Sequence, residues 1–138
     1  MPRRIGLLRS RMSLLLAATL SAAKPGASSA IAQSAGHPAF VIVERTATTG
    51  AESIQEQYAA LAREILPKYG GRYLARSRHN TLLEGDGPAP CCMAILAFPG
   101  VEAAQRWYDS PENRSAANVR QSGARFRIIA IEGLPDPK

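Results

Sequence analysis

The sequence is poor in the residues that build disulfide and metal sites. Its 138 residues include two cysteines, adjacent at Cys91 and Cys92, and two histidines. Bridging adjacent cysteines would strain the peptide between them, and a protein zinc site needs three or four ligands at suitable spacing. The chain also lacks a glycine-rich phosphate loop and a Gly-x-Ser-x-Gly nucleophile elbow. We therefore predict no disulfide framework, no metal site and no bound cofactor.

Long hydrophobic runs are missing as well. The apolar run at residues 13–23 is about half of the roughly 20 residues that a membrane-spanning helix needs. Basic residues precede it and small residues follow at 30–32, which is the order of a secretory signal peptide. We expect a signal over residues 1–32 that is cut near Ala32–Gln33, no stable membrane insertion afterwards, and a periplasmic or secreted protein. A cut near Ala35, a retained anchor and a twin-arginine signal at residues 3–4 are the alternatives.

Acidic residues are absent from the first 32 positions, which hold five basic residues. The whole chain has 17 Lys and Arg against 11 Asp and Glu, a net charge of +6. From Gln33 onward the balance is 12 basic to 11 acidic residues. Nucleic-acid binding needs clustered basic charge on the folded domain, so we predict no nucleic-acid partner. The length after the cut predicts one domain, with a linker at 33–38, the domain at 39–134 and a tail at 135–138.

Hydrophobic patterning predicts strands separated by helices. Residues 40–43, 93–98 and 126–132 are β-branched and apolar runs typical of strands. Residues 72–78 form a further extended piece that 82–84 continue. Thr49 and Glu52 have the spacing of a capping box that would begin a helix. One face of that helix would carry Ile54, Tyr58, Leu61, Ile65 and Tyr69.

The remaining residues complete the predicted order of strands and helices. Pro67 should weaken the last turn of the first helix and Gly70 should end it. A second helix is expected over 100–108, and Ser110 with Pro111 should restart a helix as cap and first residue. The order β-α-β-β-α-β predicts an α+β, ferredoxin-like fold, an antiparallel sheet with its helices on one face.

The apolar character of the predicted strands bears on whether the domain has a protein partner. Residues 40–43, 93–98 and 128–131 are apolar on both faces, whereas helices on a single face would leave the other face in water. Large exposed apolar patches are rare in monomers, and a second copy of the same face is a simple cover. We expect a homodimer with the two sheets face to face. The alternative is an open face lined by alanine and other small residues.

With the elements placed, several strings resemble one known family. They are YGGRYLAR (69–76), LEG (83–85), AFP (97–99), AA (103–104), WYDSPE (107–112) and IEG (131–133). Together they resemble the family called domain of unknown function 1330 from about Ala39 to Leu134. The resemblance implies a small dimeric α/β barrel, similar in shape to several monooxygenases, muconolactone isomerases and stress-responsive barrels, with no established activity. Asn113, where the family commonly has an aromatic residue, the Cys91-Cys92 pair and the export signal depart from the usual pattern.

Three arginines are the first candidates for chemistry. Arg72, Arg76 and Arg78 alternate along an extended segment, which would place them on one face. Guanidinium groups bind carboxylates and phosphates through paired hydrogen bonds. A charged edge strand that discourages strand-to-strand aggregation is the plainer interpretation. Arg76 is the preferred candidate because it lies within the family string.

The other candidates are a histidine, a carboxylate and three aromatic residues. His79 could act as a general base beside Glu84. Tyr73, Trp107 and Tyr108 could line a pocket for a small organic molecule, although aromatic residues at helical spacing usually pack in the core. The Cys91-Cys92 pair opens an apolar strand, which favours packing over redox chemistry.

Two functional hypotheses follow. The first is a module without a cofactor that binds a small, largely apolar organic ligand in a dimer-associated cleft through Tyr73, Arg76, Trp107 and Tyr108. The second is an enzyme, isomerase or monooxygenase-like, that acts on a small organic acid or phenol. Its catalytic candidates are Arg76, His79 and Glu84, with Tyr73 as an alternative proton donor. Catalysis would require these titratable groups to meet inside one cavity.

Overall fold

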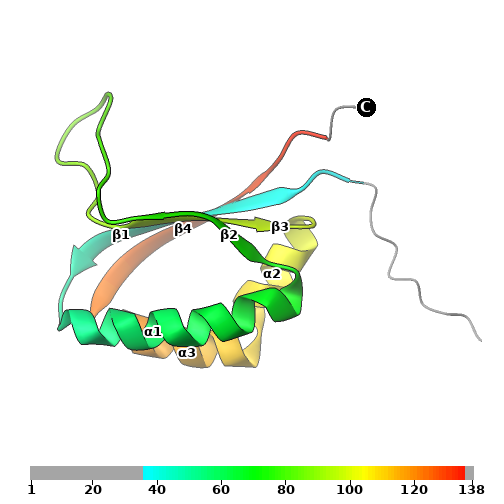
Figure 1. Cartoon of the computed structure of the whole chain (residues 1–138), viewed down its shortest axis with the longest axis horizontal. Helices are drawn as coiled ribbons and strands as arrows, with labels where there is room; N and C mark the ends of the chain where they lie inside the picture. The colour runs from blue at the N-terminus through cyan, green and yellow to red at the C-terminus, as the bar shows by residue number, and fades with distance from the viewer. Residues whose placement is uncertain (1–35, 136–138) are drawn as a thin grey trace, which may run out of the picture.

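The computed structural model describes residues 36–135 (Figure 1), so the predicted signal peptide and the last three residues lie outside the described residues. The order of elements is β1 (Ala39–Thr48), α1 (Glu52–Ile65), the 3₁₀ helix η1 (Leu66–Tyr69), β2 (Arg72–Ser77), β3 (Met93–Phe98), α2 (Val101–Asp109), α3 (Pro111–Gln121) and β4 (Ala124–Glu132). The predicted order of strands and helices is confirmed. No helix within residues 36–135 is both long and apolar enough to span a bilayer.

The four strands form one antiparallel sheet in the order β2-β3-β1-β4. The two central strands pair from Ala39 with Phe98 to Glu44 with Met93. β1 and β2 therefore flank β3 in a split β-α-β unit, as a ferredoxin-like fold requires. The helices all lie beneath one face of this sheet in Figure 1, and the opposite face carries no element. The predicted fold class is confirmed.

The core fills the space between the sheet and the helices. Val41, Leu96 and Phe98 point from the central strands to the helices and are 2–3% exposed. Trp107 of α2 is 2% exposed and lies against Phe98, with ring centroids 5.3 Å apart. Burial of such large side chains stabilises the fold by about 1.5–3 kcal/mol each.

The open face of the sheet is apolar, as the sequence predicted. Ile42 pairs with Ile95 on one side and with Ile129 on the other, so the three side chains form a row on that face. Ile95 is 36% exposed, Ile129 is 37% exposed and Ile131, near the end of β4, is 42% exposed. The alternative, a face lined by alanine and other small residues, does not describe this row.

The start of α1 differs from the sequence prediction. Ala51 is the N-cap residue, and no side chain caps the helix. The backbone N–H of Thr49 instead donates to the carbonyl of Gly123, which holds the β1–α1 turn against the start of β4. The capping-box prediction was therefore wrong. Thr49 is held by this tertiary hydrogen bond, and the helix begins only after Ala51.

The buried face of α1 is also rotated from the predicted one. Its buried residues are Gln55, Ala59, Ala62 and Ile65, whereas Leu61 is 40% exposed. Small alanines let α1 approach the neighbouring helix α3, and Gln55 stays buried because its amide donates to the carbonyl of Arg120 at 2.9 Å. Periodicity of large apolar residues alone could not reveal a face built from alanine and a hydrogen-bonded glutamine.

The end of the first helical segment and the α2–α3 junction agree with the sequence. The 3₁₀ helix holds Pro67, and Gly70 ends it with φ of 73°, a conformation that favours glycine. Ser110 caps α3 by accepting a hydrogen bond from the N–H of Asn113 at 3.2 Å. Asn113 is 2% exposed and donates to the carbonyl of Tyr108 at 2.9 Å. The residue that departs from the family pattern is thus a buried link between α2 and α3.

The edge strand β2 is shorter and less regular than predicted. It ends at Ser77, and residues 82–84 lie in an exposed loop instead of continuing the strand. The loop turns at Gly85 and Gly87, whose φ values are positive, and its prolines remove backbone donors. A bulge between Tyr73 and Ala75 shifts the pairing with β3 by one residue.

Candidate functional site

A cavity lies between the helix-facing side of the sheet and α1, near the edge strand β2, and we call it the β2–α1 cavity. It leaves about 80 Å³ accessible to the centres of water-sized molecules. Apolar side chains make up most of its wall: Val43, Tyr58, Ala59, Ala62, Leu66, Ala94, Leu96, Trp107 and Phe126. A small number of polar groups complete it: Arg45, Gln55, Tyr73, Arg76, Ser77, Arg78 and Cys92.

The polar groups gather at one end of the cavity. Arg45 and Arg78 both bind Glu52 in the first turn of α1, and the backbone N–H of Arg45 donates to the carbonyl of Cys92 at 3.0 Å. Leu66 lies beyond the other end of α1, about 20 Å along the helix axis. The cavity therefore has a cationic end at the start of α1 and an apolar end near Leu66.

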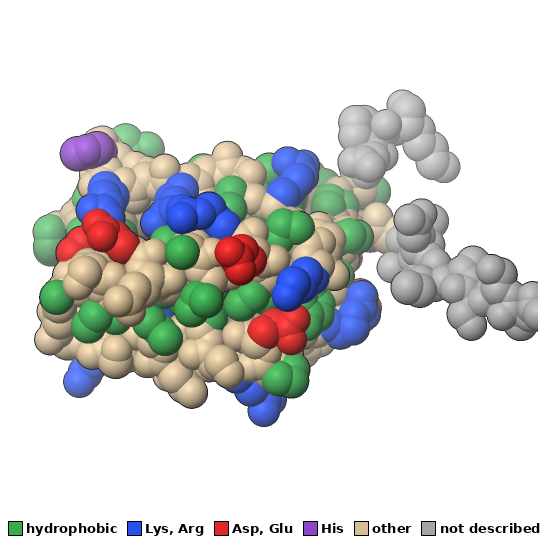
Figure 2. Space-filling view, turned by 60° about the horizontal axis from the view of Figure 1, so that its bottom comes forward, with side chains coloured by type: hydrophobic (Ala, Val, Ile, Leu, Met, Phe, Trp, Pro, Cys, Tyr) green, Lys and Arg blue, Asp and Glu red, His purple; other side chains and the backbone are tan. Residues whose placement is uncertain are grey.

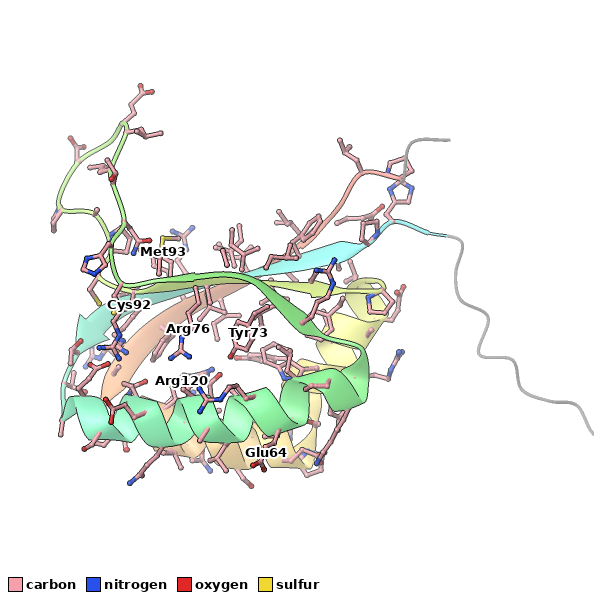
Figure 3. All side chains as sticks on the ribbon, in the orientation of Figure 1. Glu64, Tyr73, Arg76, Cys92, Met93 and Arg120 are labelled. Atoms are coloured by element: carbon pink, nitrogen blue, oxygen red, sulfur yellow. The ribbon has the colours of Figure 1, made fainter. Side chains whose placement is uncertain are left out.

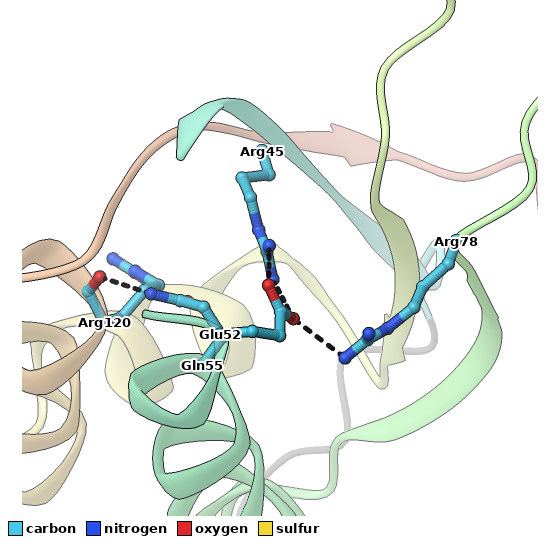
Figure 4. Close-up of polar contacts among 5 residues, drawn as sticks. All are labelled: Arg45, Glu52, Gln55, Arg78 and Arg120. Atoms are coloured by element: carbon cyan, nitrogen blue, oxygen red, sulfur yellow. Dashed lines mark hydrogen bonds and ion pairs between the residues drawn. The ribbon is translucent and has the colours of Figure 1, made fainter. Parts of the chain in front are cut away.

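The cationic end is organised by one carboxylate. Glu52 accepts two hydrogen bonds from Arg45, at 2.7 and 3.2 Å, and a third from Arg78 at 2.8 Å (Figure 4). The side chain of Arg45 is 8% exposed and that of Glu52 is 37% exposed. Hydrogen bonding with Arg45 lowers the pKa of Glu52 and raises the pKa of Arg45. This pair stays ionised at neutral pH.

A second buried guanidinium lies beside this end. Arg120 of α3 is 2% exposed and donates to the hydroxyl of Tyr58 at 3.2 Å. Its guanidinium carbon lies 5.1 Å from the ring centroid of Tyr58 and 5.0 Å from that of Phe126. Cation–π contacts of this kind partly replace the lost hydration of the charge. Sequence reasoning missed both Arg120 and Arg45, since a basic residue near a helix end or on a strand is usually solvated.

Several buried polar atoms near the cavity have no hydrogen-bond partner among residues 36–135. They are Arg45 Nε, Gln55 Oε1, Trp107 Nε1 and Arg120 Nε. Three of the four residues line the cavity. An unpaired buried donor or acceptor is costly, so each of these atoms is a candidate contact for a bound molecule or water.

The structure brings three of the predicted site residues together. Tyr73, Arg76 and Trp107 all line the β2–α1 cavity, and Figure 3 shows Tyr73 and Arg76 pointing from the sheet toward the helices. Burial raises the pKa of Tyr73, so its phenol remains protonated at neutral pH and can donate a hydrogen bond. Tyr108 lies elsewhere, on separate depressions at the β4 side and beside α3.

His79 and Glu84 are not part of this cavity. Both are exposed and lie in the loop between β2 and β3. The side chain of Ser77 anchors the start of this loop by donating to the carbonyl of His79 and accepting from its N–H. The predicted meeting of Arg76, His79 and Glu84 inside the cavity does not occur, because β2 ends before either residue.

The bulge in β2 decides which arginines reach the cavity. Arg72 pairs with Ala97 on the open face, whereas Arg76 pairs with Ala94 on the helix face, because Leu74 is inserted between them. The prediction that Arg72, Arg76 and Arg78 share one face was therefore wrong. Arg76 and Arg78 line the cavity and Arg72 does not. A bulge has no reliable signature in a single sequence.

The two cysteines differ in their surroundings, and the predicted packing role does not fit the exposed Cys91. Cys91 is exposed, Cys92 lines the cavity, and neither forms a disulfide. Burial raises the pKa of the Cys92 thiol, and the Cys91 hydrogen bond acts in the same direction. A protonated thiol is a weak nucleophile. Among residues 36–135, no group of three His, Cys, Asp or Glu side chains is arranged to hold a metal ion.

Charged side chains are dispersed over the helix side of the molecule. Figure 2 shows basic and acidic side chains across the whole of this view, with apolar and neutral side chains between them. The ion pairs of Arg78 with Glu52 and of Lys68 with Glu112 belong to the exposed surface of the domain. Exposed pairs of this kind contribute little to stability.

The sheet order and the helix layer on one face of the sheet define a protein of the ferredoxin-like α+β class. The chain belongs to the family described as domain of unknown function (DUF1330), whose model matches residues 38–134. No curated protein matches the chain.

Three solved structures share the fold. A protein of unknown function from Rhodopseudomonas palustris is 20% identical, with a TM-score of 0.57, over 72% of this chain and 84% of its own. A dabb family protein with a ferredoxin-like fold from Mesorhizobium loti is 16% identical, with a TM-score of 0.54, over 71% and 98%. A dimeric ferredoxin-like protein of unknown function from Thermobifida fusca is 15% identical, with a TM-score of 0.52, over 70% and 92%.

Proposed function

We propose that this protein is exported and binds a small, largely apolar organic molecule in the β2–α1 cavity. The observation that carries the proposal is the cavity itself, which is walled mainly by apolar and aromatic side chains and has a few convergent polar groups. The cavity lies at an edge strand, where Arg76 and Arg78 are exposed, so a ligand can enter without opening the core.

Export is supported by the first 32 residues, which have the charge and hydrophobicity order of a signal peptide. Homodimerisation is supported by the exposed isoleucine row on the open face of the sheet and by the similarity to the dimeric ferredoxin-like protein from Thermobifida fusca. Two sheets packed face to face would shield these side chains and leave the β2–α1 cavity on the outer, helix side of each protomer.

The alternative is an enzyme that acts on a small organic acid or phenol in the same cavity. Tyr73 and Arg76 could donate a proton and polarise an oxygen there. His79 and Glu84, the predicted bases, lie outside the cavity wall, which leaves this chemistry without an evident proton acceptor. We therefore favour binding over catalysis.

The test is mass spectrometry of the protein purified from the periplasmic or secreted fraction under native conditions. We expect an intact mass that begins at Gln33 and a co-purifying organic molecule. Ala59→Leu, which fills the cavity, should lose the molecule, and Ala60→Leu, on the exposed side of α1, should retain it. Ala62→Val serves as a milder filling variant if Ala59→Leu does not fold.

Two results would contradict the proposal. Equal retention by the filling variants and by Ala60→Leu would place any ligand outside the β2–α1 cavity. An uncut chain retained in the cytoplasm would remove the export part of the proposal.

A further inference from the structure

We infer that the ligand of the β2–α1 cavity is an organic carboxylate, and that Arg76 pairs with its acidic group. This inference rests on the proposed function and names the chemical class of the molecule bound. It follows from the balance of charge around the cavity, from the position of Arg76 and from the buried donors that have no partner.

The charges around the cavity do not balance. Arg45, Arg76 and Arg78 line it, and Arg120 lies directly behind Tyr58. Glu52 is the carboxylate that pairs with these arginines, and Arg45 and Arg78 already bind both of its oxygens. Arg45 and Arg120 are buried and Arg76 and Arg78 are exposed, so this end of the cavity carries an excess of positive charge that attracts an anion.

Arg76 is the cation left for a ligand. Among residues 36–135 it takes part in no ion pair and no side-chain hydrogen bond, whereas Arg45, Arg78 and Arg120 each have a partner. It lines the cavity and points beneath the sheet beside Tyr73 (Figure 3). Its planar fork of N–H groups matches the geometry of a carboxylate.

Two buried donors in the cavity wall have no acceptor among the described residues: Arg45 Nε at the cationic end and Trp107 Nε1 toward the apolar end. A carboxylate oxygen can accept a hydrogen bond from Arg45 Nε, whereas a hydrocarbon would leave this donor unpaired. Gln55 Oε1, a buried acceptor without a donor, would suit a hydroxyl or N–H elsewhere on the ligand.

These positions orient the ligand. Its acidic group would lie at the cationic end, near the first turn of α1, and its apolar body would extend toward Tyr73, Trp107 and Leu66. The bulge at Leu74 is what makes this arrangement available, because it turns Arg76 toward the helices while Arg72 stays on the open face.

The experiment is calorimetric titration of the mature protein with matched acids and amides. The probes are benzoate, phenylacetate and hexanoate, each compared with its primary amide. The variants are Arg76→Gln and, as a control on the opposite face of the same strand, Arg72→Gln. We expect at least one acid to bind wild type about tenfold or more tightly than its amide, since hydrogen bonds to charged groups are the stronger kind.

Arg76→Gln should remove this preference, and Arg72→Gln should retain it. Arg76→Lys should retain part of the preference for acids, because lysine keeps the positive charge but lacks the planar fork of N–H groups. Absence of binding by all the acids, or acids and amides that bind alike in wild type, would overturn the inference. Acids and amides that bind wild type alike, and that both fail to bind Ala59→Leu, would show that the proposed function stands while the anionic class fails.

Discussion

At the scale of single residues, Glu52 has the largest electrostatic role in the described structure. It holds Arg45, which is almost fully buried, and Arg78, which is more than half exposed. Breaking a buried ion pair is strongly destabilising because the remaining charge is left without a partner. Glu52 therefore links the stability of β1 and α1 to the shape of the cationic end of the cavity.

Glu52→Gln should lower the free energy of unfolding by about 1–2 kcal/mol at pH 7, less than for a fully buried pair because Glu52 is 37% exposed. The pKa of Glu52 is lowered in the folded protein, so its contribution is complete above its unfolded pKa of about 4.3. The contribution is lost as the pH falls through the folded pKa. Urea unfolding between pH 7 and pH 3 should therefore show the wild-type advantage disappearing at the acid end.

Glu56→Gln is the matched control, since Glu56 is exposed on the same helix and forms no ion pair within residues 36–135. It should change stability by less than about 0.5 kcal/mol at every pH. A Glu52→Gln deficit that persists unchanged at pH 3 would contradict the assignment of the effect to the carboxylate charge.

The candidate site shows how far single residues can be predicted. Tyr73, Arg76 and Trp107, chosen because aromatic residues and an arginine on a family string indicate a pocket, line one cavity, and their part in ligand binding stays a prediction. Arg45 and Arg120 were missed because their burial depends on Glu52 and on the rings of Tyr58 and Phe126. Arg45 reaches Glu52 across the β1–α1 turn, and Arg120 reaches Tyr58 from 62 residues away in the sequence.

At the scale of elements, the two helix starts differ in what holds them. Ser110 caps α3 with its hydroxyl, which accepts from Asn113 N–H, and the same hydroxyl donates to the carbonyl of Trp107 at 2.8 Å. Thr49 has the sequence of a cap but contributes only its backbone N–H, to Gly123. The local motif is alike in the two places, and the tertiary surroundings decide whether the side chain is used.

Ser110→Ala should therefore lower the free energy of unfolding by about 1 kcal/mol, the usual cost of a lost N-cap. Thr49→Ala should cost less than about 0.5 kcal/mol, because no side-chain hydrogen bond is lost there. Thermal or urea unfolding of the two variants beside wild type makes the comparison. A larger effect at Thr49 than at Ser110 would show that the capping box forms in solution.

At the scale of the whole molecule, the sheet separates two surfaces with different roles. Its helix side encloses the β2–α1 cavity, and its open side presents the row of Ile42, Ile95 and Ile129. An apolar row on a flat sheet suits the same row of a second copy, because identical faces are self-complementary about a two-fold axis. The proposed dimer and the proposed site therefore use opposite faces.

Ile129→Lys should make the protein monomeric at micromolar concentration, since a lysine would place a charge in the face-to-face interface. Leu61→Lys is the control, because Leu61 is equally exposed but lies on α1. Sedimentation velocity distinguishes the two states. A monomeric wild type, or a dimer that survives Ile129→Lys and is lost with Leu61→Lys, would contradict the sheet-to-sheet arrangement.

By itself the sequence determined the order of strands and helices, the helix breaks at Gly70 and Ser110, and the apolar character of both sheet faces. Each of these follows from local chemistry: periodicity, glycine and proline conformations, and capping side chains. Only the tertiary structure decided that Arg76 faces the cavity while Arg72 does not, and that His79 and Glu84 stay outside it. The physical reason is that a strand bulge and a strand end depend on pairing with a strand that lies elsewhere in the sequence, which local residue patterns do not specify.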